Sequence, residues 1–303
     1  MRMSIKLISS LLLLAVLSIA CADDTTPVHQ DNNSAAYIVV VNNPLLYFTQ
    51  RLIGDAVEVR LLVPEAIDPA TWQPTVADIL QLQGANLVVL NGAGYSSWLD
   101  KVSISAGRIV VTSAEAQDQW RELPDQITHS HGPGAEHAHS GYAFTTWMDM
   151  SLARVQAEAI AAALRERWPA QGDRIRDNLQ TLLADIDELD AGYRQQADRL
   201  ADRQIIYSHP VYQYFEERYR LPGYSLHWEP GVMPSDGQWG ELENRLDDSS
   251  LLIWEGEPIV AIQKKLALLG LSFVVVDPAA NTSERDWLAV QRGNVAALSR
   301  IVD

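Results

Sequence analysis

Short apolar runs alternate with helical patterns along most of this 303-residue chain, and one long helical stretch interrupts the alternation. Strands are expected at 37–41, 57–63, 86–90 and 108–112 before that stretch, and at 204–208, 251–254 and 272–276 after it. Helices are expected between them, at 45–53, 75–83, 96–102, 211–218 and 259–269. Such alternation favours parallel sheets flanked by helices, so the predicted class is α/β.

The interrupting stretch, 151–202, places its apolar residues three and four positions apart, as a helix with one apolar face does. Pro169 and Gly172 divide it and leave a second helix of about 30 residues, or about 45 Å. Such a helix either runs along the surface of one domain or connects two. Because the alternation resumes afterwards, we predict two α/β lobes with mostly parallel sheets joined by one long helix. The expected lobes are 37–150 and 203–303.

The N-terminal residues predict export. Arg2 and Lys6 precede an apolar run, 7–20, that is too short to span a bilayer but suits the core of a secretion signal. The only cysteine, Cys21, follows at once, which excludes an internal disulfide. Either Cys21 ends a lipobox and carries a lipid anchor, which its isolation favours, or it belongs to an ordinary Ala-x-Ala cleavage site. The expected segments are a signal peptide or lipobox at 1–21 and a polar tether at 22–36.

The charge and motifs exclude some functions. A formal net charge of −16 repels phosphate backbones, so we expect no nucleic-acid partner. The sequence contains no phosphate loop, G-x-G-x-x-G turn, nucleophile elbow or H-E-x-x-H motif. It offers no convincing acid–base pair either. We therefore expect a binding protein, not an enzyme.

A histidine cluster points to a transition metal. Four of the seven histidines fall within eleven residues, and these are His129, His131, His137 and His139. Neutral imidazole is the commonest zinc ligand, and His-x-His pairs let two rings converge on one ion. A Gly-Pro-Gly sequence separates the pairs, so 128–141 is predicted to be a loop. The alternative is a solvated loop whose histidine content is accidental; the clustering favours metal.

Polar residues also follow the predicted strands of the second lobe. His209, Glu255 and Asp277 each stand directly after a strand, where open α/β sheets form their ligand crevice. Each has a plainer interpretation too, as a hydrogen-bonded core histidine or as a carboxylate that caps a turn. Three such groups favour one shared site. His227 either joins them or forms part of a pocket wall.

Several short motifs together carry a family resemblance. They are Asn-Asn-Pro-Leu at 42–45, Gly-Asp-Ala-Val-Glu-Val at 54–59, Asn-Gly-Ala-Gly at 91–94, Trp-Met-Asp at 147–149, Ser-His-Pro-Val-Tyr-Gln-Tyr-Phe at 208–215 and Val-Asp-Pro at 276–278. With them the chain, from about Tyr37 onward, resembles the metal-binding solute-binding proteins of ABC importers, the cluster with zinc-specific and manganese-specific receptors. The resemblance implies two lobes that barely move, with a metal ion held between them by histidines and carboxylates.

Carried over position by position, the resemblance implies two ligands in the second lobe, His209 and Asp277. The two histidines that it implies for the first lobe are replaced by Ala70 and Thr145. An extended six-residue segment spans about 20 Å, so histidines from 128–141 could reach the cleft and substitute for them. The hypothesis is a hybrid site with two of these histidines, and Thr145 as a further cleft residue. A histidine-rich segment at this place implies zinc over manganese.

The leading prediction is an exported protein, periplasmic or anchored on the extracytoplasmic face, that captures zinc and delivers it to the permease of an ABC importer. We expect a monomer that meets the membrane only through a lipid anchor. One competing hypothesis is a degenerate relative with an accessory role, which the two replaced histidines favour. Another is a receptor for an organic solute held by Trp72, Tyr95 and Trp147. A hydrolase is the weakest candidate, because the chain lacks a nucleophile.

Overall fold

The computed structural model describes residues 35–64, 67–123, 127–130, 136–139, 141–228, 231–281 and 286–302. The predicted signal peptide, Cys21, nearly all of the predicted tether, and His131 lie outside these ranges. Among the described helices, none is long and apolar enough to cross a membrane. Ala35–Asp303 make up one compact unit.

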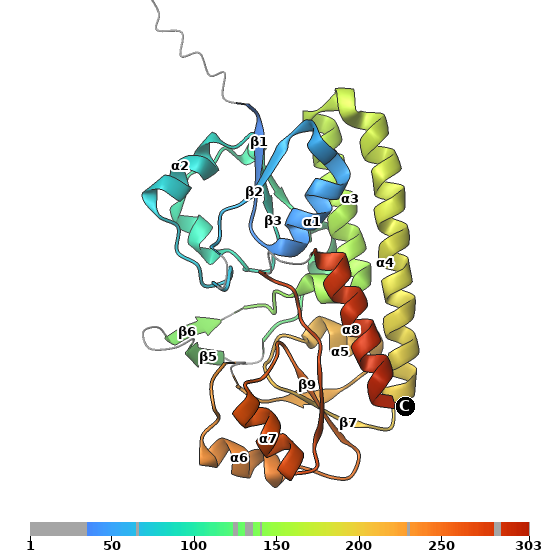
Figure 1. Ribbon diagram of the computed structural model, residues 1–303. Coiled ribbons are helices and arrows are strands. Elements are labelled where there is room, and N and C mark those ends of the chain that lie inside the picture. Colours follow the sequence, from blue (N-terminus) through green and yellow to red (C-terminus); the bar gives the residue numbers. More distant parts are fainter. Residues whose placement is uncertain are drawn as a thin grey trace, which may run out of the picture. The chain divides into compact units, whose positions relative to one another are not determined.

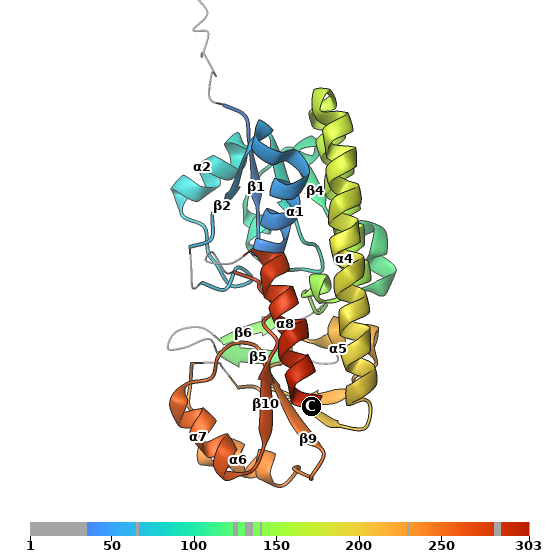
Figure 2. The same cartoon turned by 45° about the vertical axis from the view of Figure 1, so that its right-hand side comes forward.

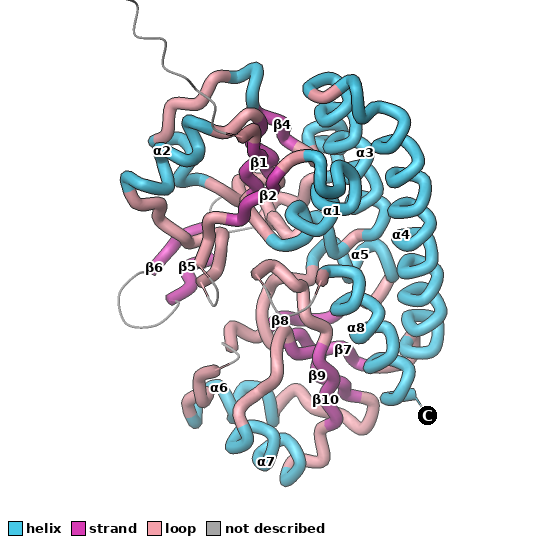
Figure 3. Tube along the Cα trace, turned by 45° about the horizontal axis from the view of Figure 1, so that its top comes forward, coloured by secondary structure: helices cyan, strands magenta, loops and turns pink. Residues whose placement is uncertain are grey.

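The first sheet has four parallel strands in the order β2-β1-β3-β4 (Figure 1). These are β1 (Tyr37–Val40), β2 (Glu58–Leu61), β3 (Leu87–Leu90) and β4 (Ile109–Val111). Every residue of β1 is buried, as expected for a parallel strand covered on both faces. Helix α2 (Val76–Gly84) lies on one side of the sheet, while α1 (Asn43–Ile53) and α3 (Met150–Arg167) lie on the other (Figures 1 and 3). This sheet and its helices are called the N-lobe.

The second sheet, in the C-lobe, is also parallel, with the order β10-β9-β7-β8. Its strands are β7 (Gln204–Tyr207), β8 (Gly223–Ser225), β9 (Ser250–Trp254) and β10 (Ser272–Val275). Its helices are α5 (Gln213–Tyr219), α6 (Asp236–Glu243), α7 (Val260–Leu268) and α8 (Trp287–Val302). The predicted class, two α/β lobes with parallel sheets, is confirmed.

The predicted long helix is present as α4 (Gly172–Leu200), which is 29 residues long. It packs along α3, α1 and α8 and passes beside both lobes (Figure 2). One face carries its buried residues, among them Ile175, Leu182, Ile186, Leu189 and Tyr193. Their spacing of three, four and seven positions is the apolar stripe of a helix that packs on one side only.

Two local predictions were wrong. The predicted loop 128–141 contains an antiparallel hairpin, β5 (Ile127–Ser130) and β6 (Glu136–His139). Two short strands joined by a few residues can pair without a crossover, which the loop prediction overlooked. The predicted helix 96–102 is instead a 3₁₀ turn, Ser97–Lys101, because a run this short closes hydrogen bonds across three residues, as from Val102 N to Leu99 O (2.8 Å).

Candidate functional site

The polar candidates of the C-lobe lie at one edge of its sheet. In the parallel register, Tyr207 pairs with Ile253 of β9 and Trp254 pairs with Val275 of β10, so the carboxyl ends of the strands are neighbours. Hydrogen bonds continue past the strand ends, from Ser208 N to Ile253 O (2.9 Å) and from Val276 N to Trp254 O (2.9 Å). The residues that follow the four strands within two positions are His209, His227, Glu255 and Asp277.

His209 is buried, with 4% of its surface exposed, while His227 on the same edge is exposed. The turn that carries His209 is fixed by its own backbone, because Val211 N donates to His209 O (2.9 Å). Ser208 beside it is fully buried, and its hydroxyl accepts a hydrogen bond from Glu255 N (3.3 Å). The exits of β7 and β9 are therefore joined directly.

Asp277 is half-buried and held from two sides. Asn294 of α8 accepts from Asp277 N (3.0 Å) and donates to Asp277 O (2.8 Å), while one carboxylate oxygen of Asp277 accepts from Ala279 N (2.7 Å). Tyr212 reports on its surroundings: burial raises the pKa of the Tyr212 phenol, and the negative charges of Glu255 and Asp277 raise it further. Both carboxylates therefore act on one buried hydroxyl.

The strap of residues 278–281, which follows Asp277, is pinned to the N-lobe. Trp147 Nε1 donates to Pro278 O (2.7 Å), and Asn43 donates through its side chain to Ala279 O (3.2 Å) and through its backbone to Ala280 O (2.9 Å). The strap is therefore part of the C-lobe chain but is held in place by hydrogen-bond donors of the N-lobe, so contacts from both lobes fix the backbone next to Asp277.

The two N-lobe positions where the resemblance implies histidine are buried. Ala70 is 8% exposed and Thr145 is 4% exposed. The Thr145 hydroxyl donates to Val211 O (2.6 Å), which lies two residues after His209. Thr145 therefore connects the lobes through a neutral hydrogen bond.

The aromatic residues that could have bound an organic solute pack against one another. The rings of Trp72 and Trp98 meet edge to face at 5.1 Å, and those of Tyr95 and Trp147 meet at 5.5 Å. All four residues are buried. Their stacking is that of a core, which weighs against an organic solute held by these side chains.

Sequence reasoning missed a buried polar network in the N-lobe. Asn91, directly after β3, donates to Phe144 O (2.8 Å) and accepts from Thr146 Oγ1 (3.1 Å) and from Gln156 Nε2 (2.9 Å). Gln156 also donates to Thr112 Oγ1 (3.0 Å), just beyond β4. Two of these residues stand after strands, which was an available signal; Gln156, on the inner face of α3, gave none.

The histidine-rich hairpin brings its histidine positions into register. His129 lies opposite His137, and Ile127 lies opposite His139. The hairpin projects at a level between the two sheets, on the side away from α4 (Figures 1 and 2). Among the side chains that the structure describes, no three His, Cys, Asp or Glu groups converge as a metal site.

A separate pocket of about 370 Å³ lies beside α5, and none of the candidate ligands lines it. Its walls are Arg121, Gln213, Glu216, Glu217 and Pro222. Burial raises the pKa of the Glu216 carboxyl to about 7, although a hydrogen bond from the Gly223 backbone opposes the shift.

The fold has two parallel α/β lobes, a connecting helix and ionisable groups at the carboxyl ends of strands, which is where open α/β sheets bind their ligands. Residues 38–301 match the family described as zinc-uptake complex component A, periplasmic, and the chain belongs to it. This is a family of metal-binding solute-binding proteins of ABC importers.

Relatives with curated names share modest identity. The high-affinity zinc uptake system protein ZnuA of Bacillus subtilis is 27% identical over 183 residues, which are 59% of this chain and 56% of the relative. The zinc-binding lipoprotein AdcA of Streptococcus pneumoniae is 21% identical over 272 residues, 86% of this chain and 54% of the relative. The chain thus spans about half the length of these relatives.

Solved structures share the fold. The Zn(II)-bound ZnuA-like domain of Streptococcus pneumoniae AdcA superposes with a TM-score of 0.74 at 18% identity, covering 89% of this chain and 99% of that one. The solute-binding protein FpvC of Pseudomonas aeruginosa, in complex with Mn²⁺, gives 0.67 at 19% identity, covering 88% and 97%.

Proposed function

We propose that this protein captures zinc outside the cytoplasm and delivers it to the permease of an ABC importer. Family membership supports the class, and the zinc-named relatives support the cargo. The observation that carries the proposal is the C-lobe edge, where a buried imidazole, His209, and the carboxylates of Glu255 and Asp277 follow adjacent parallel strands. The protein acts as a monomer, and lipid at Cys21 is its only membrane anchor.

The proposed ligand set combines the C-lobe edge with the hairpin. Zinc in proteins takes nitrogen, oxygen and sulfur ligands, usually four in a tetrahedron. His209 and Asp277 supply two, and the hairpin supplies imidazoles from two of His129, His131, His137 and His139. Glu255 and His227 stand on the same edge as additional donors, and Thr145 shapes the cleft through its bond to Val211 O. Manganese fits less well, because it prefers oxygen ligands to imidazole.

Such a site would load in two stages. The hairpin histidines collect zinc weakly, because ordering a projecting segment costs conformational entropy. Transfer to His209 and Asp277 then adds ligands from a rigid edge and removes the ion from water. Imidazole must be neutral to bind metal, so loading releases protons and weakens as the pH falls below about 6.

Titration calorimetry of the mature protein with zinc and with manganese tests this proposal. We expect submicromolar zinc binding and weaker manganese binding. His209→Ala should abolish tight binding, and the double substitution His137→Ala/His139→Ala should weaken it by at least about tenfold. His29→Ala, in the predicted tether, is the matched control and should change nothing. An unchanged zinc affinity in the double variant would remove His137 and His139 from the ligand set, and an unchanged affinity with all four hairpin histidines replaced by alanine would refute the hybrid site.

A second candidate function, an accessory role without metal delivery, is favoured by one observation. The first-lobe positions that would complete an ordinary site carry Ala70 and a hydrogen-bonded Thr145. Silence toward both metals in the same titration would favour this alternative, or a receptor for an organic solute, over zinc delivery.

A further inference from the structure

The short helix α5 starts four residues after His209 and is tied to one segment of the chain in three places. That segment, residues 143–149, is called the connector because it runs from the histidine hairpin to α3. The connector also contains Thr145 and Trp147. Whatever fixes α5 against the connector therefore fixes the buried C-lobe histidine against the base of the hairpin.

Two ties lie at the first end of α5. The Thr145 hydroxyl donates to Val211 O (2.6 Å), and the Tyr214 hydroxyl donates to Ala143 O (2.8 Å). The same Tyr214 hydroxyl accepts from Arg121 N (3.2 Å). Ala143 N in turn donates to Arg121 O (2.7 Å). The Tyr214 hydroxyl therefore contacts both of the segments that pair at the base of the hairpin.

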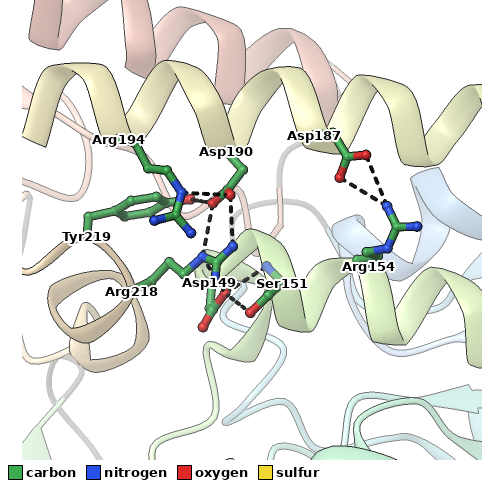
Figure 4. Close-up of polar contacts among 8 residues, drawn as sticks. All are labelled: Asp149, Ser151, Arg154, Asp187, Asp190, Arg194, Arg218 and Tyr219. Atoms are coloured by element: carbon green, nitrogen blue, oxygen red, sulfur yellow. Dashed lines mark hydrogen bonds and ion pairs between the residues drawn. The ribbon is translucent and has the colours of Figure 1, made fainter.

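The third tie lies at the other end of α5 and is ionic (Figure 4). Arg218 donates two parallel hydrogen bonds to the carboxylate of Asp190 on α4, at 3.0 and 2.8 Å. Its Nε also lies 3.4 Å from the carboxylate of Asp149, the last residue of the connector. Tyr219 adds a hydrogen bond to Asp190 (3.1 Å), and Asp149 in turn caps α3 by accepting from Ser151 N (2.7 Å).

The ion pairs of Arg218 are largely buried, so water screens them less than it screens an ion pair on the surface. The side chains of Arg218, Asp190 and Asp149 are 24%, 18% and 14% exposed. Burial opposes ionisation of Asp190, but hydrogen bonds from Arg218 and Arg194 outweigh it and hold the pKa of that carboxyl below its ordinary value. Removing Arg218 would leave two half-buried carboxylates that repel each other across the junction of α4, α5 and the connector.

We propose that Arg218 is a positioning residue for the cargo site: by locking α5 to the connector, it holds the base of the hairpin against the segment that carries His209. The inference rests on the proposed function and deepens it. Ligand groups must be held within about 0.5 Å of their productive geometry, and loss of an outer support costs metal sites about 10- to 100-fold in affinity.

The test compares Arg218→Met with a matched control, Arg194→Met, in the mature full-length protein. Arg194 belongs to the same cluster, but its ion pair is with Asp190 one turn away on α4, and it does not reach the connector. Arg218→Lys keeps the charge while losing the paired hydrogen bonds, and it serves if the methionine variant does not fold. The readouts are amide hydrogen exchange at 127–130 and 136–139 without metal, and zinc affinity by calorimetry.

We expect Arg218→Met to speed hydrogen exchange in the hairpin and to weaken zinc binding at least about tenfold, with Arg194→Met within about twofold of wild type. Arg218→Lys should fall between them. In a background where all four hairpin histidines (His129, His131, His137 and His139) are replaced by alanine, Arg218→Met should have little further effect on zinc, because no hairpin ligands remain to be misplaced. A merely structural role would lower the zinc affinity by the same factor in both backgrounds.

The outcomes separate this inference from the proposed function. Unchanged hairpin exchange in Arg218→Met, or an equal loss of zinc affinity in both backgrounds, would overturn the positioning role while leaving zinc capture intact. If the wild-type protein binds no zinc, zinc capture is refuted. If Arg218→Met nevertheless speeds hydrogen exchange in the hairpin, the mechanical link between Arg218 and the hairpin still holds.

Discussion

The two lobes share a strand order and differ in what they place at its edge. Numbered within each lobe, both sheets run second, first, third, fourth. Their carboxyl ends are therefore equivalent positions. In the N-lobe, Asn42, Asn91 and Thr112 stand there, and all three are buried. In the C-lobe the corresponding edge carries imidazoles and carboxylates.

The difference shows that strand order fixes a location but not its use. Asn42 caps α1 by accepting from Leu45 N (3.0 Å), and Asn91 binds the connector and α3. Asn91 and Thr112 are held by hydrogen bonds within the N-lobe, whereas the C-lobe edge carries imidazole and carboxylate groups, the types that bind a transition metal. The N-lobe edge is thus a joint, and the C-lobe edge is the candidate site.

The sharpest way to break this comparison is Asp277→Asn. Asparagine keeps an acceptor for Ala279 N but loses the negative charge, so zinc affinity should fall by about 100-fold, or ~2.7 kcal/mol, while the melting temperature changes little. Calorimetry and thermal unfolding of the same sample provide both measurements. Equal zinc affinity would remove Asp277 from the ligand set.

Asn91→Leu should show the opposite pattern. The nearly isosteric leucine leaves Phe144 O, Thr146 and Gln156 without their buried partner, so the free energy of unfolding should fall by about 3 kcal/mol. Zinc affinity of the folded protein should stay within about threefold. Urea denaturation measures the first effect; a large affinity loss with unchanged stability would contradict the division between joint and site.

Glu216→Gln, on α5, tests how the free energy of unfolding depends on pH. The folded protein raises the Glu216 pKa to about 7 from an ordinary value of 4.5, so folding favours the protonated carboxyl. Its stability contribution is present below about pH 4.5 and is lost as the pH rises through 7. The variant should therefore be more stable than wild type by about 1 kcal/mol at pH 8, after allowance for solvent screening, and equal to it at pH 4. Urea midpoints at both pH values measure this, and a constant difference would show that Glu216 does not titrate here.

Arg154→Met should have the smallest effect. Arg154 pairs with Asp187 between α3 and α4 (3.0 Å), and these side chains are 39% and 65% exposed (Figure 4). Exposed pairs contribute about 0.2–1 kcal/mol to stability, and this one serves neither edge, so zinc affinity should not change. A fall of more than about 1 kcal/mol in the free energy of unfolding, measured with urea, would mean that the packing of α3 on α4 depends on surface charges.

Much of the fold could be predicted from local pattern. Fully apolar strands are a strong signal, because a strand covered on both faces has apolar residues at every position. The helix α4 is another, because its apolar residues recur every three or four positions. Two of the missed segments, β8 and α6, give weak signals. β8 has three residues, and α6 contains Gly237 and Gly240, which lower helix propensity, so only the Ser235 capping box marks its start.

The candidate site was predictable only on the C-lobe side. Residues directly after strands are conspicuous in a sequence, which is how His209, Glu255 and Asp277 were found. The ties of α5 to the connector were not predictable, because Arg218 and Asp149 are 69 positions apart and look like ordinary surface charges. Contacts between distant segments depend on tertiary packing that local pattern does not encode. All of the proposed metal ligands, at the C-lobe edge and in the hairpin, remain predictions.

The strap after Asp277 has a thermodynamic consequence for loading. Its carbonyls are already held by Trp147 and Asn43, so an incoming ion would find this carboxylate preorganised and would spend little entropy in arresting it. Changes in the length of the hairpin would then alter the metal affinity, while Asp277 would stay in a position that is already fixed.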